Sequence, residues 1–239
     1  MSKILAINLS PRKHGTSTLL LHECKDHLKE CGHNVRYICL YEHTNNLQPI
    51  FDQVKDADTL ILCGPCYVNT YPADTIKLLQ ELAAHPDILH GQNLYGIIQG
   101  GMPYAHTHKS GLNMLEIFSA KTDLNYKGGF VMGLGAMLDG HPLDNLPNGK
   151  KVKRQLRVFF HHIGCGELSP DSVYEAAIMK MPSIVARILA RYMNRTIDKS
   201  YAKRGMDAYQ PTPYLSDKIN TKSSKPEHTN SFGQSAANR

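Results

Sequence analysis

The sequence predicts an α/β protein in which helices cover both faces of a parallel sheet. Five apolar runs of strand length alternate along the chain with segments of helical periodicity, and this alternation is typical of a parallel sheet. The first run, Lys3–Leu9, is almost unbroken in its apolar residues, as expected of a strand that is buried on both faces. At 239 residues the chain is long enough for one such domain and an appendage.

The first helix follows the first strand closely. Apolar residues recur every three or four positions over 16–31, and Gly32 stands where this helix should end. The same reasoning predicts further strands at 35–40, 59–64, 94–99 and 129–133, and further helices at 49–55, 72–84, 106–120, 150–163 and 182–197. Ligands of such sheets bind beyond the carboxyl ends of the strands, so the loops after the first, third and fourth strands are the expected site.

The loop after the first strand is suited to hold a phosphate group. It offers hydroxyls and a guanidinium at the start of a helix, where unpaired amides and the helix dipole favour an anion. Neither G-x-G-x-x-G nor G-x-x-x-x-G-K-(S/T) is present, so a single terminal phosphate, as on FMN, fits better than a dinucleotide or a nucleoside triphosphate. The alternative is an ordinary strand-to-helix turn capped by Ser or Thr. The candidate residues are Ser10, Arg12, Gly15, Thr16, Ser17 and Thr18.

The loops after the third and fourth strands are suited to a planar ring. In the first of them Gly64 and Pro65 turn the chain, and Tyr67 and Tyr71 offer flat apolar surfaces. The paired glycines at 100–101 let backbone amides approach a ligand edge closely. Plain turns also need Gly and Pro, so each loop alone is weak evidence for a ligand site. The evidence is stronger because three such loops follow three strands of the predicted sheet.

These motifs together resemble those of the flavodoxin-like NADPH-dependent FMN reductases and their relatives, the iron-sulfur flavoproteins. The first loop fits the pattern S-P-R-x-x-G-(N/T)-(S/T), and the likeness extends over about residues 3–165. Its other parts are the GPCY sequence at 64–67, Pro72 with Lys77, the glycine pair at 100–101 and the segment GGFVMGLGAMLDG at 128–140. Iron-sulfur members carry a compact cysteine cluster after the second strand, whereas 41–49 contains no cysteine here, so no iron-sulfur centre is expected.

The resemblance implies a flavodoxin-like, doubly wound sheet of five strands in the order 2-1-3-4-5. It also implies which residues hold FMN. The phosphate ligands would be Ser10, Arg12, Thr16, Ser17 and Thr18. The isoalloxazine ring would be held by Pro65, Cys66, Tyr67, Val68, Asn69, Gly100 and Gly101.

The activity implied by the resemblance is hydride transfer from NADPH or NADH through FMN to a small acceptor, such as a quinone, a nitro or azo compound, or free flavin. No Ser-His-Asp set or pair of catalytic carboxylates is evident, and none is needed where a flavin does the chemistry. Two alternatives remain. One is a flavodoxin-type electron carrier, although such carriers are typically acidic and this chain has a net charge of +6. The other is a non-catalytic FMN-binding protein.

Two rival motifs predict other chemistry. Residues 63–66 spell C-G-P-C, the redox motif of thioredoxins, but the chain lacks tryptophan, and Cys63 falls at the end of an apolar strand instead of opening a helix. We therefore expect no dithiol function there. The histidine pairs at 106, 108 and at 161, 162 lack the spacing and the acidic partners of a zinc site, so no metal is expected.

Composition narrows the partners and the compartment. No apolar run approaches eighteen residues, so no transmembrane segment is expected. The six cysteines lie mostly in apolar patterns, as expected of reduced core residues in a cytoplasmic protein. No basic stretch is interleaved with aromatic residues, so nucleic acid is not an expected partner.

The chain changes character after residue 166. We predict an FMN-binding domain at 1–166, a helical extension at 167–215 and a disordered tail at 216–239. The helix at 182–197 has an apolar face and an arginine stripe, and we expect it to pack on the domain or on a second subunit of a dimer or tetramer, not on a membrane surface. Residues 201–214 read as a connector.

Overall fold

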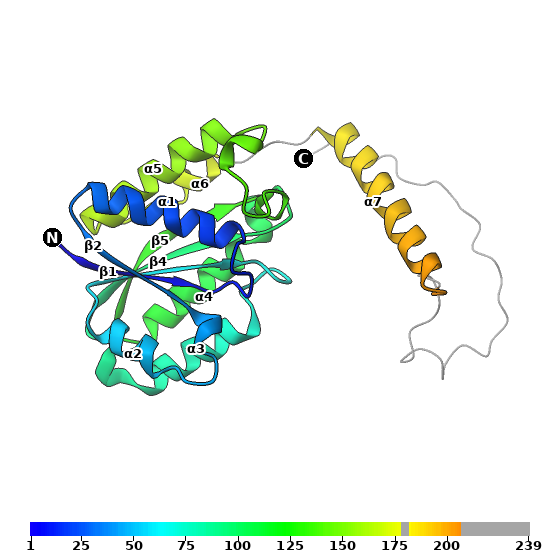
Figure 1. Ribbon diagram of the computed structural model, residues 1–239. Coiled ribbons are helices and arrows are strands. Elements are labelled where there is room, and N and C mark those ends of the chain that lie inside the picture. The colour runs from blue at the N-terminus through cyan, green and yellow to red at the C-terminus, as the bar shows by residue number, and fades with distance from the viewer. Residues whose placement is uncertain (178–181, 207–239) are drawn as a thin grey trace, which may run out of the picture. The chain divides into compact units, whose positions relative to one another are not determined.

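Five parallel strands form one sheet in the order β2-β1-β3-β4-β5 in the computed structural model, which describes residues 1–177 and 182–206 (Figure 1). The strands are β1 (Lys3–Asn8), β2 (Asn34–Cys39), β3 (Thr59–Pro65), β4 (Gln92–Gln99) and β5 (Leu124–Met132). The predicted fold, a flavodoxin-like doubly wound sheet with a helix in the C-terminal segment, is therefore confirmed.

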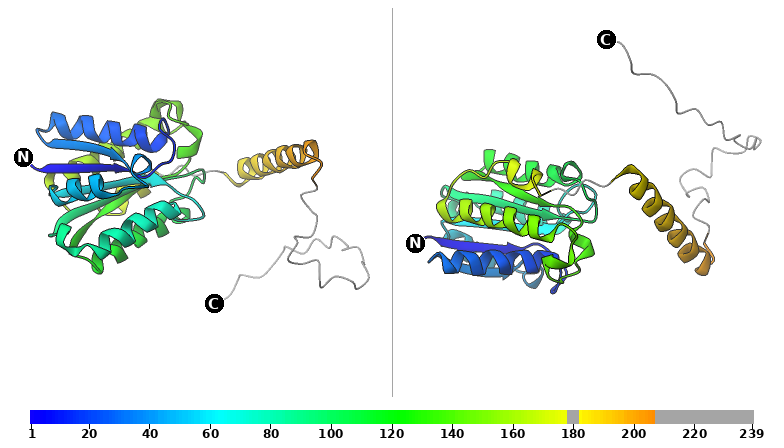
Figure 2. Two further views of the ribbon diagram at one scale, coloured as in Figure 1. Left: turned by 60° about the horizontal axis from the view of Figure 1, so that its bottom comes forward. Right: turned by 90° about the horizontal axis from the view of Figure 1, so that it is seen from above.

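Helices cover both faces of this sheet. Figure 1 shows α1, α5 and α6 on one face and α2, α3 and α4 on the other, and α1 and α5 run side by side when seen from above (Figure 2). The helices are α1 (Thr16–Glu30), α2 (Gln48–Lys55), α3 (Ala73–Ala84), α4 (Lys109–Ala120), α5 (Gly149–Cys165), α6 (Ser172–Glu175) and α7 (Ser183–Lys203). Short 3-10 turns lie at Leu40–Glu42, Pro86–Ile88, Ala105–Thr107, Gly135–Met137 and Leu143–Asn145.

The core lies between the sheet and its two helical layers. Every residue of the central strand β3 is buried, and so are five of the six residues of β1, because helices cover these strands on both sides. Leu20 and Leu28 of α1 and Phe159 of α5 are fully buried on one face, and Leu78 of α3 and Leu115 of α4 on the other. Removal of this apolar surface from water is the main stabilising contribution to the fold.

The structure differs from the sequence prediction mainly at element ends. β5 begins at Leu124, five residues before the predicted start. The sequence pattern missed these five residues because the half-exposed Tyr126 and Lys127 interrupt the apolar run of this edge strand. α4 begins at Lys109 and not at residue 106, after the separate turn Ala105–Thr107. α7 continues to Lys203, so the prediction that a connector begins at residue 201 is wrong for the first three residues.

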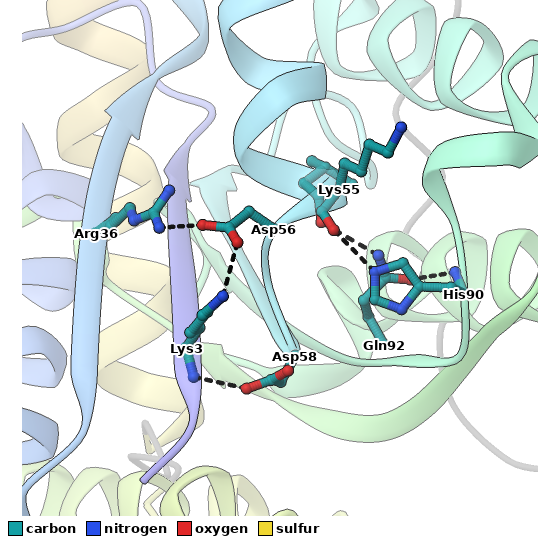
Figure 3. A network of polar contacts seen from close by, with 8 residues as sticks. Lys3, Arg36, Lys55, Asp56, Asp58, His90 and Gln92 are labelled. Carbon is teal, nitrogen blue, oxygen red and sulfur yellow. Dashed lines mark hydrogen bonds and ion pairs between the residues drawn. The ribbon is translucent and has the colours of Figure 1, made fainter.

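Polar side chains hold the amino ends of the strands together (Figure 3). Asp56 accepts hydrogen bonds from Lys3 Nζ, at 2.7 Å, and from Arg36 of β2, and these two cations lower the pKa of its carboxyl group. Asp58 accepts from the main-chain N–H of Lys3 at 2.8 Å, and Gln92 Nε2 donates to two carbonyls. The ion pairs are exposed, so they contribute little to the stability of the protein.

Gly128 makes a bulge in β5 and brings a further segment to the edge of the sheet. The pairing of β5 with β4 shifts between Leu94 and Gly96, and Gly128 has φ +98°. Ser169 forms a parallel bridge with Gly128 and donates its N–H to the Lys127 carbonyl at 2.7 Å. The segment that leads to α6 is thereby fixed along the outer edge of β5.

Residues 182–206 form a separate compact unit that contains α7. One side of α7 carries Ile184, Val185 and Ile188, and another carries basic residues, including Arg187 and Arg191. No helix of the described residues is long and apolar enough to cross a membrane. The predicted tail at 216–239 lies outside the described residues, and the division at residues 166 and 215 stays a prediction.

Replacing Gly128 with alanine should destabilise the protein strongly. The added Cβ would lie 2.1 Å from the Ser169 carbonyl oxygen, at a backbone conformation that already disfavours a side chain. Gly32→Ala is the matched control, because Gly32 has φ +86° and an added Cβ would meet no atom within 4 Å. Urea unfolding should give a loss of about 1 kcal/mol for Gly32→Ala and about 3 kcal/mol or more for Gly128→Ala. Equal losses would show that only the backbone conformation matters.

Candidate functional site

A cavity of about 250 Å³ opens where the strands end at their carboxyl edge. The loops that follow β1, β3, β4 and β5 all contribute to its wall, as the topology of a doubly wound sheet requires. The wall consists of Ser10, Arg12, Gly15, Thr16, Pro65, Cys66, Tyr67, Gln99, Gly100, Gly101, Ala136 and Asp139. A larger cavity of about 600 Å³ lies along β5 and α4, and none of the loops selected from the sequence lines it.

Besides Gly15 of the phosphate loop, eight of the twelve residues expected to hold FMN line this cavity. They are Ser10, Arg12, Thr16, Pro65, Cys66, Tyr67, Gly100 and Gly101. The other four, Ser17, Thr18, Val68 and Asn69, do not. Three further lining residues were not among those expected to hold FMN, namely Gln99, Ala136 and Asp139. Gln99 gave a signal as the polar last residue of an apolar strand, and the other two lie in the segment 128–140 that carries part of the family resemblance.

The start of α1 presents three unpaired amides to the phosphate loop. Gly15 is the N-cap residue, no side chain caps the helix, and the first main-chain bond of the helix runs from Leu19 N–H to the Gly15 carbonyl. Within the described residues, the N–H groups of Thr16, Ser17 and Thr18 therefore donate to no acceptor. Such a helix start is a site for an anion.

Arg12 reaches across the mouth of the cavity to the loop after β5. Its Nη1 lies 3.0 Å from Asp139 Oδ1, and both side chains are about 70% exposed. An exposed ion pair of this kind contributes little to stability. The Arg12 guanidinium can therefore exchange this carboxylate for a phosphate at small cost.

A buried hydrogen bond also joins the loop after β5 to the phosphate loop. Thr16 Oγ1 donates to the Gly135 carbonyl at 2.7 Å, and both residues are buried. A Cβ on Gly135 would lie 2.5 Å from Gln99 Oε1, so only glycine allows the loop this close to β4. Gln99 Nε2 donates to Ser17 Oγ at 3.3 Å, whereas its buried Oε1 accepts from no group among the described residues.

The loop after β3 ends in a tight two-residue turn. Tyr67 and Thr70 exchange two main-chain hydrogen bonds, and Val68 and Asn69 between them have φ +50° and +66°. Positive φ at both central residues defines a type I′ turn. A β-branched residue such as Val68 is strained there, by about 1 to 3 kcal/mol, and its side chain is 97% exposed. The turn leaves the Tyr67 side chain half-exposed at the cavity wall.

The two glycines after β4, Gly100 and Gly101, have different roles. Gly100 donates its N–H to the Met132 carbonyl at 3.2 Å, and an added Cβ would lie 2.4 Å from Nε2 of the buried His108. Burial lowers the pKa of His108, so this imidazole is neutral packing under the loop. The N–H of Gly101 donates to no acceptor among the described residues and is free to meet a ligand.

The C-G-P-C motif does not have thioredoxin geometry. Cys63 lies within β3 and its Sγ donates to the Ser17 carbonyl, whereas Cys66 Sγ donates to the Thr107 carbonyl on another segment. Three residues of extended strand span about 10 Å, beyond the separation that a disulfide bridges. Burial raises the pKa of both thiols, which keeps them protonated at neutral pH. Among the described residues there is also no group of three or more metal-ligating side chains.

Comparison with known proteins gives a family for this chain. Residues 2–122 match the model of the family described as NADPH-dependent FMN reductase, a range that contains the loops after β1, β3 and β4. No curated protein sequence matches the chain.

Solved structures with the same fold include several flavoproteins. An NADH:FMN oxidoreductase in its apo form is 20% identical, with a TM-score of 0.58 over 73% of this chain and 94% of that one. An FMN-dependent NADH-azoreductase from Bacillus anthracis, in complex with FMN, is 15% identical, with a TM-score of 0.53 over 69% of this chain and all of that one. A flavone reductase is 12% identical, with a TM-score of 0.55 over 94% of this chain and all of that one.

The thiols should react in an order set by their burial. Cys31 and Cys165 are exposed, whereas Cys24 and Cys63 are fully buried with a raised pKa. In native protein, Ellman's reagent should modify Cys31 and Cys165 within minutes and leave Cys24 and Cys63 intact until denaturant is added. Peptide mapping after diamide oxidation should find no disulfide between Cys63 and Cys66. Such a disulfide in the native protein would contradict the strand geometry.

Proposed function

Because the chain belongs to the NADPH-dependent FMN reductase family, whose cofactor is FMN, we propose that it transfers hydride from NAD(P)H through FMN to a small acceptor. The acceptor classes we propose are quinones, nitro or azo compounds, and free flavin. The observation that carries this proposal is the cavity at the carboxyl edge of the sheet. One end of it offers unpaired hydrogen-bond donors, and the other offers a flat side chain and a glycine amide.

The donor end of the cavity fits a phosphate monoester. Phosphate oxygens accept hydrogen bonds at neutral pH, and the start of α1 supplies three N–H groups without an acceptor among the described residues. The Ser10 hydroxyl accepts from Arg12 N–H at 3.2 Å and keeps its own proton for a ligand. The Arg12 guanidinium adds a full positive charge at the cavity mouth.

The other end of the cavity fits a ring with a polar edge. Tyr67 and Pro65 form one wall, and Gly101 supplies an N–H that can hydrogen-bond to a carbonyl edge. Gln99 Oε1 is a buried acceptor in the same wall, and the ribityl chain and ring of FMN carry the donors that it lacks. The residues present therefore fit FMN at both ends.

When bound, FMN supplies the acceptance and release of hydride, so the chain needs no acid or base of its own for that step. The protein would position the ring between Tyr67 and the glycine loop. The Gly101 N–H would stabilise negative charge at the ring edge, because a fixed donor in a site sheltered from water needs no reorientation. The loop after β5, held by Thr16 to the phosphate loop, would shield the site from water.

We also propose that the apolar side of α7 packs on the domain or on a second copy of the chain, in a dimer or tetramer. Ile184, Val185, Ile188 and Leu189 lie on one side of this helix at spacings of one, three and four residues. A helix with such a side gains most of its stability from packing against an apolar surface. A second copy of the chain could supply that surface, and the apolar side of α7 therefore supports the proposal of an oligomer.

Reduction by pyridine nucleotide distinguishes an enzyme from a carrier. Protein loaded with FMN should lose its yellow flavin absorbance when NADPH or NADH is added without oxygen, and a quinone should restore the colour. A carrier would hold FMN but respond poorly to either nucleotide. Protein that holds FMN and stays yellow with both nucleotides would refute the reductase proposal.

Arg12→Ala should weaken FMN binding by about ten- to a hundredfold, because a hydrogen bond to a charged group contributes about 1.5 to 3 kcal/mol. Riboflavin lacks the phosphate and should bind both proteins almost equally. Arg154→Ala, at an exposed arginine of α5, is the matched control and should change neither affinity. The measurement is quenching of flavin fluorescence by apoprotein at two salt concentrations, and the effect of Arg12→Ala should shrink at high salt. Unchanged FMN affinity in Arg12→Ala would show that this arginine does not bind the phosphate.

A further inference from the structure

We infer that Asn8 and Thr18 are positioning residues that hold the phosphate loop in its binding shape, and that the Thr18 hydroxyl does not itself donate to the phosphate. This inference rests on the proposed FMN site and concerns how the loop is built. Neither residue lines the cavity. Both belong to one hydrogen-bond network behind it, which is buried at Asn8 and Ser10, half-buried at Thr18 and exposed at Lys13.

The orientation of the Asn8 amide follows from its partners. Asn8 is the last residue of β1 and is fully buried. The main-chain N–H of Ser10 lies 2.9 Å from Asn8 Oδ1, and because an N–H can only donate, that end of the amide must be the oxygen. The amide nitrogen therefore faces Thr18 Oγ1, at 2.9 Å, and the Tyr37 hydroxyl, at 2.8 Å. Both of its protons are used.

The Thr18 hydroxyl then has no proton left for a ligand. Its Oγ1 receives a hydrogen bond from Asn8 and lies 2.9 Å from the Lys13 carbonyl, which can only accept. The single hydroxyl proton must therefore go to Lys13. A phosphate needs donors, so Thr18 could serve it only by breaking this bond, whereas the proton of the Ser10 hydroxyl is free of any partner among the described residues.

The network joins the two ends of the phosphate loop to two strands. Asn8 bonds to Ser10 at the start of the loop, and Thr18 carries the same network to Lys13 in its middle. Tyr37 ties the amide to β2, and burial raises the pKa of that phenol to about 12, which keeps its proton in place. The distance between the Ser10 hydroxyl and the free amides of α1 is thereby fixed before a phosphate arrives.

A double-mutant cycle tests whether Thr18 acts through Asn8. Thr18→Val and Asn8→Leu should each raise the Kd for FMN about tenfold, as expected for one hydrogen bond on which a charged ligand depends. The double variant should be no more than about threefold weaker than the poorer single variant, because both changes break the same network. Riboflavin affinity should change less than about twofold throughout. Thr18→Ser keeps the hydroxyl and should bind FMN within about threefold of wild type.

The Tyr37→Phe variant tests the same inference if the Asn8→Leu protein does not fold. Tyr37 lies outside the cavity wall, so only a positioning role predicts that its loss weakens FMN binding, here by about threefold. The matched control is Tyr95→Phe, because the Tyr95 side chain is also buried and its hydroxyl donates its one proton toward the carbonyls of Glu167, at 2.7 Å, and His162, at 3.1 Å, away from the cavity. That variant should lose stability in urea while its preference for FMN over riboflavin stays that of wild type.

Each outcome decides the inference. Additive effects of Thr18→Val and Asn8→Leu, about a hundredfold together, would make Thr18 a direct ligand and overturn it. Equal weakening of FMN and riboflavin, or wild-type FMN binding by Tyr37→Phe, would also overturn it while leaving the proposed function intact. A wild-type protein that binds no FMN would overturn the proposed function and this inference with it.

Discussion

Three main-chain amides at the start of α1 lack an acceptor among the described residues, and the rest of the site is arranged around that deficit. Buried or half-buried N–H groups are normally paired, so a helix start left uncapped marks a place for an external anion. Other groups nearby are already paired with one another. Thr16 bonds to the loop after β5, and Thr18 bonds within the phosphate loop. The amides and the Ser10 hydroxyl are left to bind, and Arg12 can join them by exchanging its exposed ion pair with Asp139.

The sequence was sufficient for the sheet because burial dominates its central strands. An apolar run such as Lys3–Leu9 has no stable place outside a core, and the helix after it repeats its apolar residues at the helical period. The pattern was weaker at the edge of the sheet. Tyr126 and Lys127 face partly outward in β5, so the first five residues of that strand carried no strand signal. The extra length of α7 was missed because Gly205 and the two prolines at 211 and 213 made the whole segment from residue 201 read as a connector.

The sequence predicted which loops form the candidate site, but not which of their side chains line it. Successive residues of a helix point about 100° apart, so Thr16 reaches the cavity while Ser17 faces the core and bonds to Gln99. Sequence spacing gives no measure of which hydroxyl has already given its proton to a carbonyl. The buried Asn8 gave one signal, a polar residue that ends an apolar strand, and the same signal marks Gln99 at the end of β4. In a doubly wound sheet, a polar residue at the last position of a strand is therefore a candidate for a role in the site.

The amino edge of the sheet offers a practical advantage that follows from strand direction alone. β1 begins there at Lys3, beside the fully exposed Met1, and runs toward the phosphate loop (Figure 1). Its six residues span about 20 Å at 3.3 Å per residue. A fluorophore or surface tether attached at Met1 would thus stand a whole strand length from the cavity, on the far side of the Asp56 ion pairs. An attachment there would leave the loops that line the cavity untouched by the attached group.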